Sequence, residues 1–66
     1  MTIEEIQASI EKIRKLSDDE ERAHGEEDNL YRSFIEYIAR GRPREVRRKA
    51  QLIITTKDID FIRWTS

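Results

Sequence analysis

The sequence predicts a small all-α domain: a three-helix bundle with two long antiparallel helices, a shorter third helix and a short C-terminal helical turn. Apolar residues recur every three or four positions over much of the chain, which is the spacing of one face of a helix. Residues that favour the start or the end of a helix stand between these stretches. We expect residues 1–66 to form one domain with a small core, because so short a chain buries only about 60% of its unfolded surface.

The first expected helix begins after Thr2. The Thr2 hydroxyl can accept a hydrogen bond from an early backbone N–H, and the Glu5 carboxylate can accept one from the Thr2 N–H, which together form a capping box. The apolar positions that follow form one narrow stripe: Ile3, Ile6, Ile10, Ile13 and Leu16. Such a stripe is typical of a helix face that packs against another helix.

The longest expected helix runs from Ser17 to Gly41, and the rest of the chain is expected to pack against it. Ser17 and Glu20 predict a second capping box, and Gly41 can take the left-handed conformation that ends a helix. The inward stripe is expected at Ala23, Glu27, Leu30, Phe34, and Ile38 or Tyr37. The first two turns are poor in apolar residues, so we expect them to project past the core or to line a polar pocket. Gly25 costs about 1 kcal/mol relative to alanine, which predicts a close approach to its backbone or a bend.

The third expected helix begins at Pro43, because proline suits the first helical position. Its apolar side is expected at Val46, Ala50, Ile53 and Ile54. Residues 52–56 are rich in β-branched side chains, but no second strand is available to pair with them, so we interpret them as a helix end. A last helical turn, residues 57–64, is expected to fold back so that Phe61 or Trp64 closes one end of the core.

Acidic and basic residues are separated along the chain. Charged residues make up 41% of the sequence, yet the net charge is only −1. Residues 18–28 hold seven acids against one base, and residues 40–49 hold six bases against one acid. This asymmetry can steer partners or drive self-association. The alternative interpretation is that the charges lie on solvated helix faces and have no partner.

Composition argues against several classes of protein. The chain has no cysteine, so it offers no disulfide, thiolate metal site or thiol nucleophile, which fits a reducing, cytoplasmic setting. No stretch approaches the roughly 20 apolar residues of a membrane helix. The domain is too small for a scaffold with a deep cleft and has a single histidine. We therefore expect no enzymatic activity and no cofactor.

His24 lies among carboxylates on one helical face. The spacing of Glu21 and His24 occurs in carboxylate metal sites of four-helix proteins, but such a site needs a second copy of the motif and two further glutamates. With one histidine, only a symmetric dimer could supply that copy. The alternative is a helix start whose acids are favoured by the helix dipole, and the sequence predicts no metal site.

The polar cluster and the tail are expected to meet. If the tail docks on the long helix, Arg63 can pair with Glu27 or Asp28, and Asp60 can accept a hydrogen bond from His24. Such a network would be structural, because half-buried charges are tolerated when they are paired. The alternative is a pocket for a small ligand or nucleotide, made of His24, Glu27, Asp28, Asp60, Arg63 and Trp64.

The basic segment, residues 40–49, is a candidate for binding a partner, although a site is most expected in residues 18–28, which are too polar to serve packing alone. The planar fork of arginine suits carboxylate and phosphate groups, and the arginines expected to bind are Arg40, Arg44, Arg47 and Arg48. An isoelectric point of about 5.8 lies below that of a dedicated nucleic-acid binder. We therefore expect an acidic protein surface as the partner, with another copy of the chain as a candidate. A weak nucleic-acid binder remains a further alternative.

Two short motifs resemble small proteins encoded by bacteriophages and mobile elements. The motifs are Ala23-His24-x-x-Glu27-Asp28-x-Leu30 and Ile59-Asp60-Phe61-x-Arg63-Trp64, and the resemblance covers roughly residues 18–64. It implies an intracellular accessory protein that binds a host protein, and it transfers no catalytic residue. The sequence as a whole predicts a non-enzymatic protein-interaction module that also associates with itself.

Overall fold

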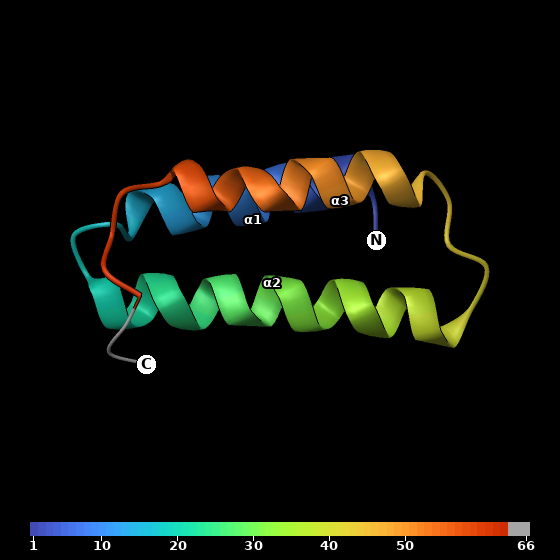
Figure 1. Ribbon diagram of the computed structural model, residues 1–66, viewed down its shortest axis with the longest axis horizontal. Coiled ribbons are helices and arrows are strands. Elements are labelled where there is room, and N and C mark those ends of the chain that lie inside the picture. The colour runs from blue at the N-terminus through green and yellow to red at the C-terminus, as the bar shows by residue number, and fades with distance from the viewer. Residues whose placement is uncertain (64–66) are drawn as a thin grey trace.

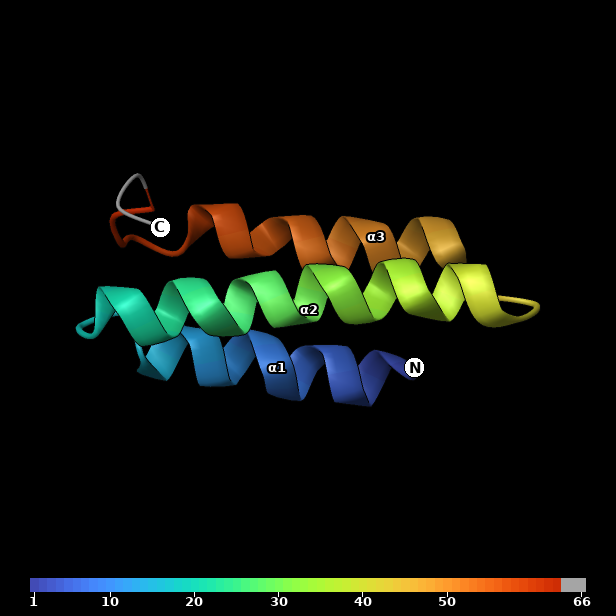
Figure 2. The ribbon, with the colours of Figure 1, turned by 90° about the horizontal axis from the view of Figure 1, so that it is seen from below.

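The computed structural model describes residues 1–63, and within them it confirms the predicted three-helix bundle. Helix α1 spans Ile3–Lys15, α2 spans Glu20–Arg40 and α3 spans Val46–Ile54, and the short 3₁₀ helix η1 spans Thr55–Asp58. In Figure 1, α1 and α3 lie together on one side of α2. The view in Figure 2 places α2 in front, between α1 and α3. Both neighbours run antiparallel to α2, and the bundle is 35 Å long.

Helix α1 begins as predicted. Glu5 N–H donates to the Thr2 hydroxyl at 3.1 Å, and Thr2 N–H donates to the Glu5 carboxylate at 2.7 Å, which completes the capping box. The predicted isoleucine stripe supplies the core residues of this helix: Ile6, Ile10 and Ile13. Local periodicity and capping thus determine α1, because all its signals lie within the helix itself.

Helix α2 begins later than predicted, because Asp19 caps it instead of Ser17. The Asp19 carboxylate accepts from Arg22 N–H at 3.3 Å, and Ser17 lies in the turn before the helix. The Ser17 N–H donates to the Arg14 carbonyl at 3.2 Å, so the winding of α1 continues through that residue. Because the winding of α1 extends through Ser17, α2 can start only after that residue.

The first half of α2 packs into the bundle, contrary to the prediction that it projects past the core or lines a polar pocket. Ala23 is fully buried, and Glu27 is buried although it is charged. The tail after η1 covers this half, since Ile59 and Phe61 both belong to the core cluster. Phe61 was predicted to close one end of the core, whereas Trp64, the other candidate, lies outside the described residues.

No part of the described chain approaches Gly25. A methyl group built on this residue would meet nothing within 4 Å outside its own helix, and α2 continues through it without a break. The prediction of a close approach to its backbone is therefore wrong within this chain.

The connection between α2 and α3 differs from the predicted glycine stop and proline start. Gly41 has φ −166°, which is extended and not left-handed, and Pro43 lies in the loop. The residue with positive φ is Glu45, at φ 50°, directly before α3. The Tyr37 hydroxyl accepts from Arg44 N–H at 2.7 Å, so a side chain of α2 fixes the path of this loop.

Residues 52–56 are helical, as predicted: α3 ends at Ile54, and η1 follows directly. The expected turn therefore falls at residues 55–58, earlier than residues 57–64, and the backbone is extended from Ile59. Ile53 is buried, whereas Ile54 is 59% exposed and does not belong to the apolar side. Two polar residues of this part of the chain, Lys49 and Thr56, are buried although Ile54 is not.

Gly25→Ala is expected to raise the free energy of unfolding by about 0.5–1 kcal/mol, because alanine loses less backbone entropy in a helix and has room here. Urea denaturation at low micromolar concentration, followed by circular dichroism, measures the gain. Gly41→Ala serves as a control, since Gly41 lies beyond the helix and offers no such gain. A loss of stability in Gly25→Ala would contradict this account of α2.

Candidate functional site

Arg63 in the tail binds Glu27 in α2 through two parallel hydrogen bonds. The Nε–H donates to Glu27 Oε1 at 2.9 Å, and the second bond, from a terminal nitrogen to Oε2, measures 3.1 Å. The Glu27 side chain is only 5% exposed, and that of Arg63 is 23% exposed. This is one of the two contacts predicted for Arg63, and its planar, bidentate geometry is the strongest form of such a pair.

The same guanidinium organises the tail backbone. It donates to the carbonyls of Thr56 at 2.7 Å, Ile59 at 3.1 Å and Phe61 at 3.1 Å, and it stacks on the Phe61 ring at 3.7 Å. These carbonyls lie where the chain leaves η1 and becomes extended. Arg63 therefore holds the tail in a fixed path over α2.

Glu27 is ionised in this environment. Burial raises the pKa of Glu27, but the hydrogen bonds from Arg63 and Thr56 and the charge of Arg63 together lower it by more than burial raises it. The net shift is downward, so the carboxylate stays charged at neutral pH. The Arg63–Glu27 pair is one of the two contacts of the structural network that the sequence offers as an alternative to a ligand pocket.

His24 pairs within its own helix instead of with the tail. Its Nδ1 lies 3.3 Å from Asp28 Oδ2, one turn further along α2. Among residues 1–63, no hydrogen bond joins His24 to Asp60, which is exposed. The described residues also contain no group of three histidine, aspartate or glutamate side chains placed to hold a metal ion.

Lys49 closes the opposite end of α2, a role that sequence reasoning missed. Lys49 is only 5% exposed, and its Nζ donates to the Tyr37 hydroxyl at 2.8 Å while lying 4.6 Å from the ring centroid. Hydrogen bonds from Lys49 and from Arg44 N–H lower the pKa of Tyr37. Val46 and Ile53 flank Lys49 at helical spacing, and this signal could have placed it on the inner face of α3.

The arginines of residues 40–49 are exposed at the turn between α2 and α3, at the right-hand end of Figure 1. They are Arg40, Arg42, Arg44, Arg47 and Arg48. Of these five arginines, Arg48 alone has a carboxylate of the described residues within 4 Å, that of Glu45 at 3.7 Å. This end of the bundle therefore presents four of these five guanidinium groups without a carboxylate within 4 Å among residues 1–63.

The acids of residues 18–28 lie at the other end, around the turn between α1 and α2. Asp18, Asp19, Glu21 and Asp28 are exposed. The 21 residues of α2 separate this acidic end from the basic end by about 30 Å. The two charge clusters cannot neutralise each other within one chain, so α2 with its adjoining turns is polarised along its length, while α1 places Lys12, Arg14 and Lys15 at the acidic end.

Two isoleucines are exposed on α2 close to the basic end. Ile35 is 65% exposed and Ile38 is 39% exposed, and their spacing of three places them on neighbouring positions of one side. These two side chains come shortly before the basic end along the chain.

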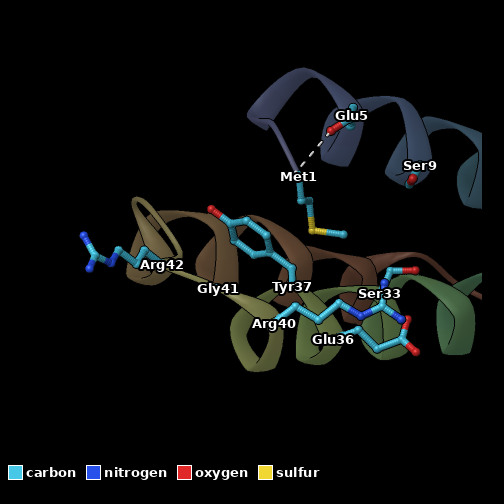
Figure 3. A pocket seen from close by; sticks show the side chains of 9 residues that line it. All are labelled: Met1, Glu5, Ser9, Ser33, Glu36, Tyr37, Arg40, Gly41 and Arg42. Carbon is cyan, nitrogen blue, oxygen red and sulfur yellow. Dashed lines mark ion pairs between the residues drawn. The ribbon is translucent and has the colours of Figure 1, made fainter.

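A groove of about 560 Å³ lies between the start of α1 and the last turns of α2 (Figure 3). The Met1 side chain points into it, and the Tyr37 ring forms part of its wall. Its charged lining is mixed: Glu5, Glu36, Arg40 and Arg42. Neither this groove nor the two smaller hollows on the described surface includes a member of the predicted ligand pocket.

Comparisons with known proteins give no family for this chain. It matches no protein-family model, and no significant match appears among curated proteins or solved structures. In the described part of the chain, no helix has both the length and the apolar character needed to cross a membrane.

Arg63→Ala is expected to lower the free energy of unfolding by about 3 kcal/mol at neutral pH, because it leaves the Glu27 carboxylate buried without its partner. The loss should be smaller in acid, where only the bonds to the tail carbonyls and the Phe61 contact are missing. The pKa of Glu27 is lowered by folding, so the pair's contribution is complete above the unfolded pKa of about 4.3 and vanishes as the pH falls through the folded value. Urea denaturation at a series of pH values measures both effects.

The control for this variant is Asp60→Ala, an exposed change in the same tail that should leave stability unaltered. If wild type and Arg63→Ala differed equally at all pH values, the bonds to backbone carbonyls, and not the Glu27 pair, would account for the loss.

Tyr37→Phe is expected to lower the melting temperature more than Tyr31→Phe does. Tyr37 provides the acceptor for the buried Lys49 ammonium and for Arg44 N–H, and phenylalanine leaves both without it. The Tyr31 hydroxyl has one long contact, 3.5 Å from the Thr56 hydroxyl. Differential scanning fluorimetry compares the two variants, and an equal decrease would refute the special role of Tyr37.

Proposed function

We propose that this chain is a non-enzymatic protein-interaction module that works in the cytoplasm and binds an acidic protein surface through its basic end. The observation that carries the proposal is the set of exposed arginines at the turn between α2 and α3, of which one has a nearby carboxylate among residues 1–63. Guanidinium forks match carboxylates in geometry and charge. An acidic surface would supply the partners that this end of the bundle lacks.

The basic end is displayed on a supported loop. The Tyr37 hydroxyl accepts a hydrogen bond from Arg44 N–H and donates one to the Arg44 carbonyl. The buried Lys49 donates to the same hydroxyl. A loop held in one path loses less conformational freedom when it binds a partner. This support favours a role in recognition for Arg44 and the neighbouring Arg47.

Ile35 and Ile38 add apolar area beside these arginines. Protein interfaces combine an apolar centre with arginine, whereas a surface for nucleic acid depends chiefly on phosphate contacts. This combination favours a protein partner. The resemblance to phage and mobile-element proteins adds a host protein to the candidates.

The small-ligand alternative receives less support. Glu27 and Arg63, two of its proposed members, bind each other and hold the tail. The pKa of Glu27 is lowered, which is what a structural ion pair requires. These groups are occupied in building the fold.

The double variant Arg44→Glu, Arg47→Glu is expected to weaken binding to an acidic polypeptide by about tenfold or more, because it reverses the charge that steers and holds the partner. Fluorescence anisotropy with labelled poly-L-glutamate at low ionic strength measures the affinity. Far-ultraviolet circular dichroism should show unchanged helix content, since both side chains are exposed.

The matched control is Arg14→Glu, Lys15→Glu, which makes the same change of net charge at the other end of the bundle. An equal loss in both double variants would mean that net charge and not the basic end governs binding, and would overturn the proposal. Tighter binding of labelled single-stranded DNA by the same arginines would assign the surface to nucleic acid instead.

A further inference from the structure

We propose that a second copy of this chain packs on the outer side of α2 in antiparallel orientation, so that the acidic half of each α2 faces the basic half of the other. This inference rests on the proposed function and names the chain itself as an acidic partner. It draws on a stripe of exposed residues, on the chemistry of that stripe, and on the glycine in its middle.

The stripe follows α2 on its outer side. Positions spaced alternately by four and three residues are all exposed: Glu21, Gly25, Asp28, Arg32, Ile35 and Ala39. This spacing averages 3.5 residues, which keeps one face of a helix turned toward a partner helix along its length. Along the stripe the chemistry changes from acidic, through Arg32 and Ile35, to the basic end beyond Ala39.

An antiparallel pair with its two-fold axis at the level of Leu30 makes the stripe complementary to itself. Residues at equal distances from Leu30 then lie opposite each other. Asp28 and Arg32, each two positions from Leu30, meet as opposite charges across the interface. By symmetry the same pair forms twice, as in any isologous contact.

Gly25 and Ile35 are each five positions from Leu30, so they also lie opposite each other in this pairing. A glycine within an exposed helix costs about 1 kcal/mol relative to alanine, and none of residues 1–63 fills the space beside it. Ile35 is the most exposed large apolar side chain of the described residues. Placed over Gly25 of the second copy, Ile35 gains a surface to pack on and gives the glycine a role.

The polarised charge of α2 selects the antiparallel arrangement. A parallel pair would bring acid against acid and base against base, which is repulsive. In the antiparallel pair, Glu21 lies opposite Ala39 of the second copy and close to its exposed Arg40. Arg42, which points away from Met1 and Tyr37 in Figure 3, extends this basic end toward Asp18 and Asp19 of the second copy.

Head-to-tail stacking of the bundle ends would also join opposite charges. It would leave Ile35 exposed, however, and it would produce open chains of molecules instead of a closed dimer. The lateral pair satisfies both the charges and the apolar side chain. Because one helix pair buries less than the roughly 800 Å² per partner of a standard interface, the dimer should dissociate on dilution.

Sedimentation equilibrium of the full chain tests the dimer directly. At low ionic strength, the average mass should rise from 7.9 kDa toward twice that value as the concentration increases, and added salt should reverse the rise. A wild-type chain that stays monomeric at about millimolar concentration and low salt would overturn the inference.

A charge exchange tests the pairing register. Asp28→Arg and Arg32→Asp should each weaken the dimer by about tenfold, because each places like charges opposite each other. The double variant should restore the affinity to within about threefold of wild type. Failure of the double variant to recover would exclude this register.

A matched pair of isoleucine variants tests the apolar contact. Ile35→Ser should weaken the dimer, whereas Ile54→Ser should not, because Ile54 is similarly exposed, at 59% against 65%, but lies on α3 away from the stripe. Equal weakening would refute the role of the α2 stripe. A wild-type chain that stays monomeric but binds poly-L-glutamate would refute the dimer and leave the proposed function standing. A wild-type chain that dimerises but does not bind poly-L-glutamate would refute the proposed function and leave the dimer standing.

Discussion

The ion pair between Glu27 and Arg63 is the contact on which the arrangement of this small bundle depends. The first half of α2 has a single buried apolar side chain, Ala23, and a buried carboxylate. Such a helix half can be interior only if an opposite charge comes with the segment that covers it. The tail meets this condition, because Ile59 and Phe61 supply apolar cover and Arg63 supplies the charge.

At each end of α2, a cationic side chain from another part of the chain binds a side chain of the helix, but the two acceptors differ. At one end Arg63 binds a carboxylate, and at the other Lys49 binds the neutral Tyr37 hydroxyl. The arginine pair cancels charge inside the bundle. The lysine covers its stem with apolar neighbours and brings its ammonium to a phenol at the edge. One contact fixes the tail, and the other fixes the loop that carries the basic end.

Sequence reasoning succeeded where the determining residues are close together. The capping box at Thr2 and the isoleucine stripe of α1 are local signals, and the structure follows them. The start of α2 and the loop before α3 were predicted wrongly, because the end of α1 and the Tyr37 side chain decide them from outside each segment. Lys49 was missed because its charge suggests the surface while its position in the helix period places it inside. The pairing of Arg63 with Glu27 was one of two that were predicted, the other being with Asp28, since a half-buried charge in a docked tail needs an opposite charge. The partner of His24 was not, because Asp28 is nearer along the same helix.

The covering of α2 by the tail also sets an order of assembly. Glu27 and Arg63 are 36 positions apart, whereas the bonds within each helix join near neighbours. On a ribosome, α1 and α2 emerge before the tail has been made. The polar first half of α2 is well solvated at that stage, because Glu27 is charged and in water. This half of α2 can be buried only after residues 59–63 have been made, so the C-terminal tail completes the bundle. Until then the charged Glu27 favours a solvated helix, because burying it without Arg63 would be costly.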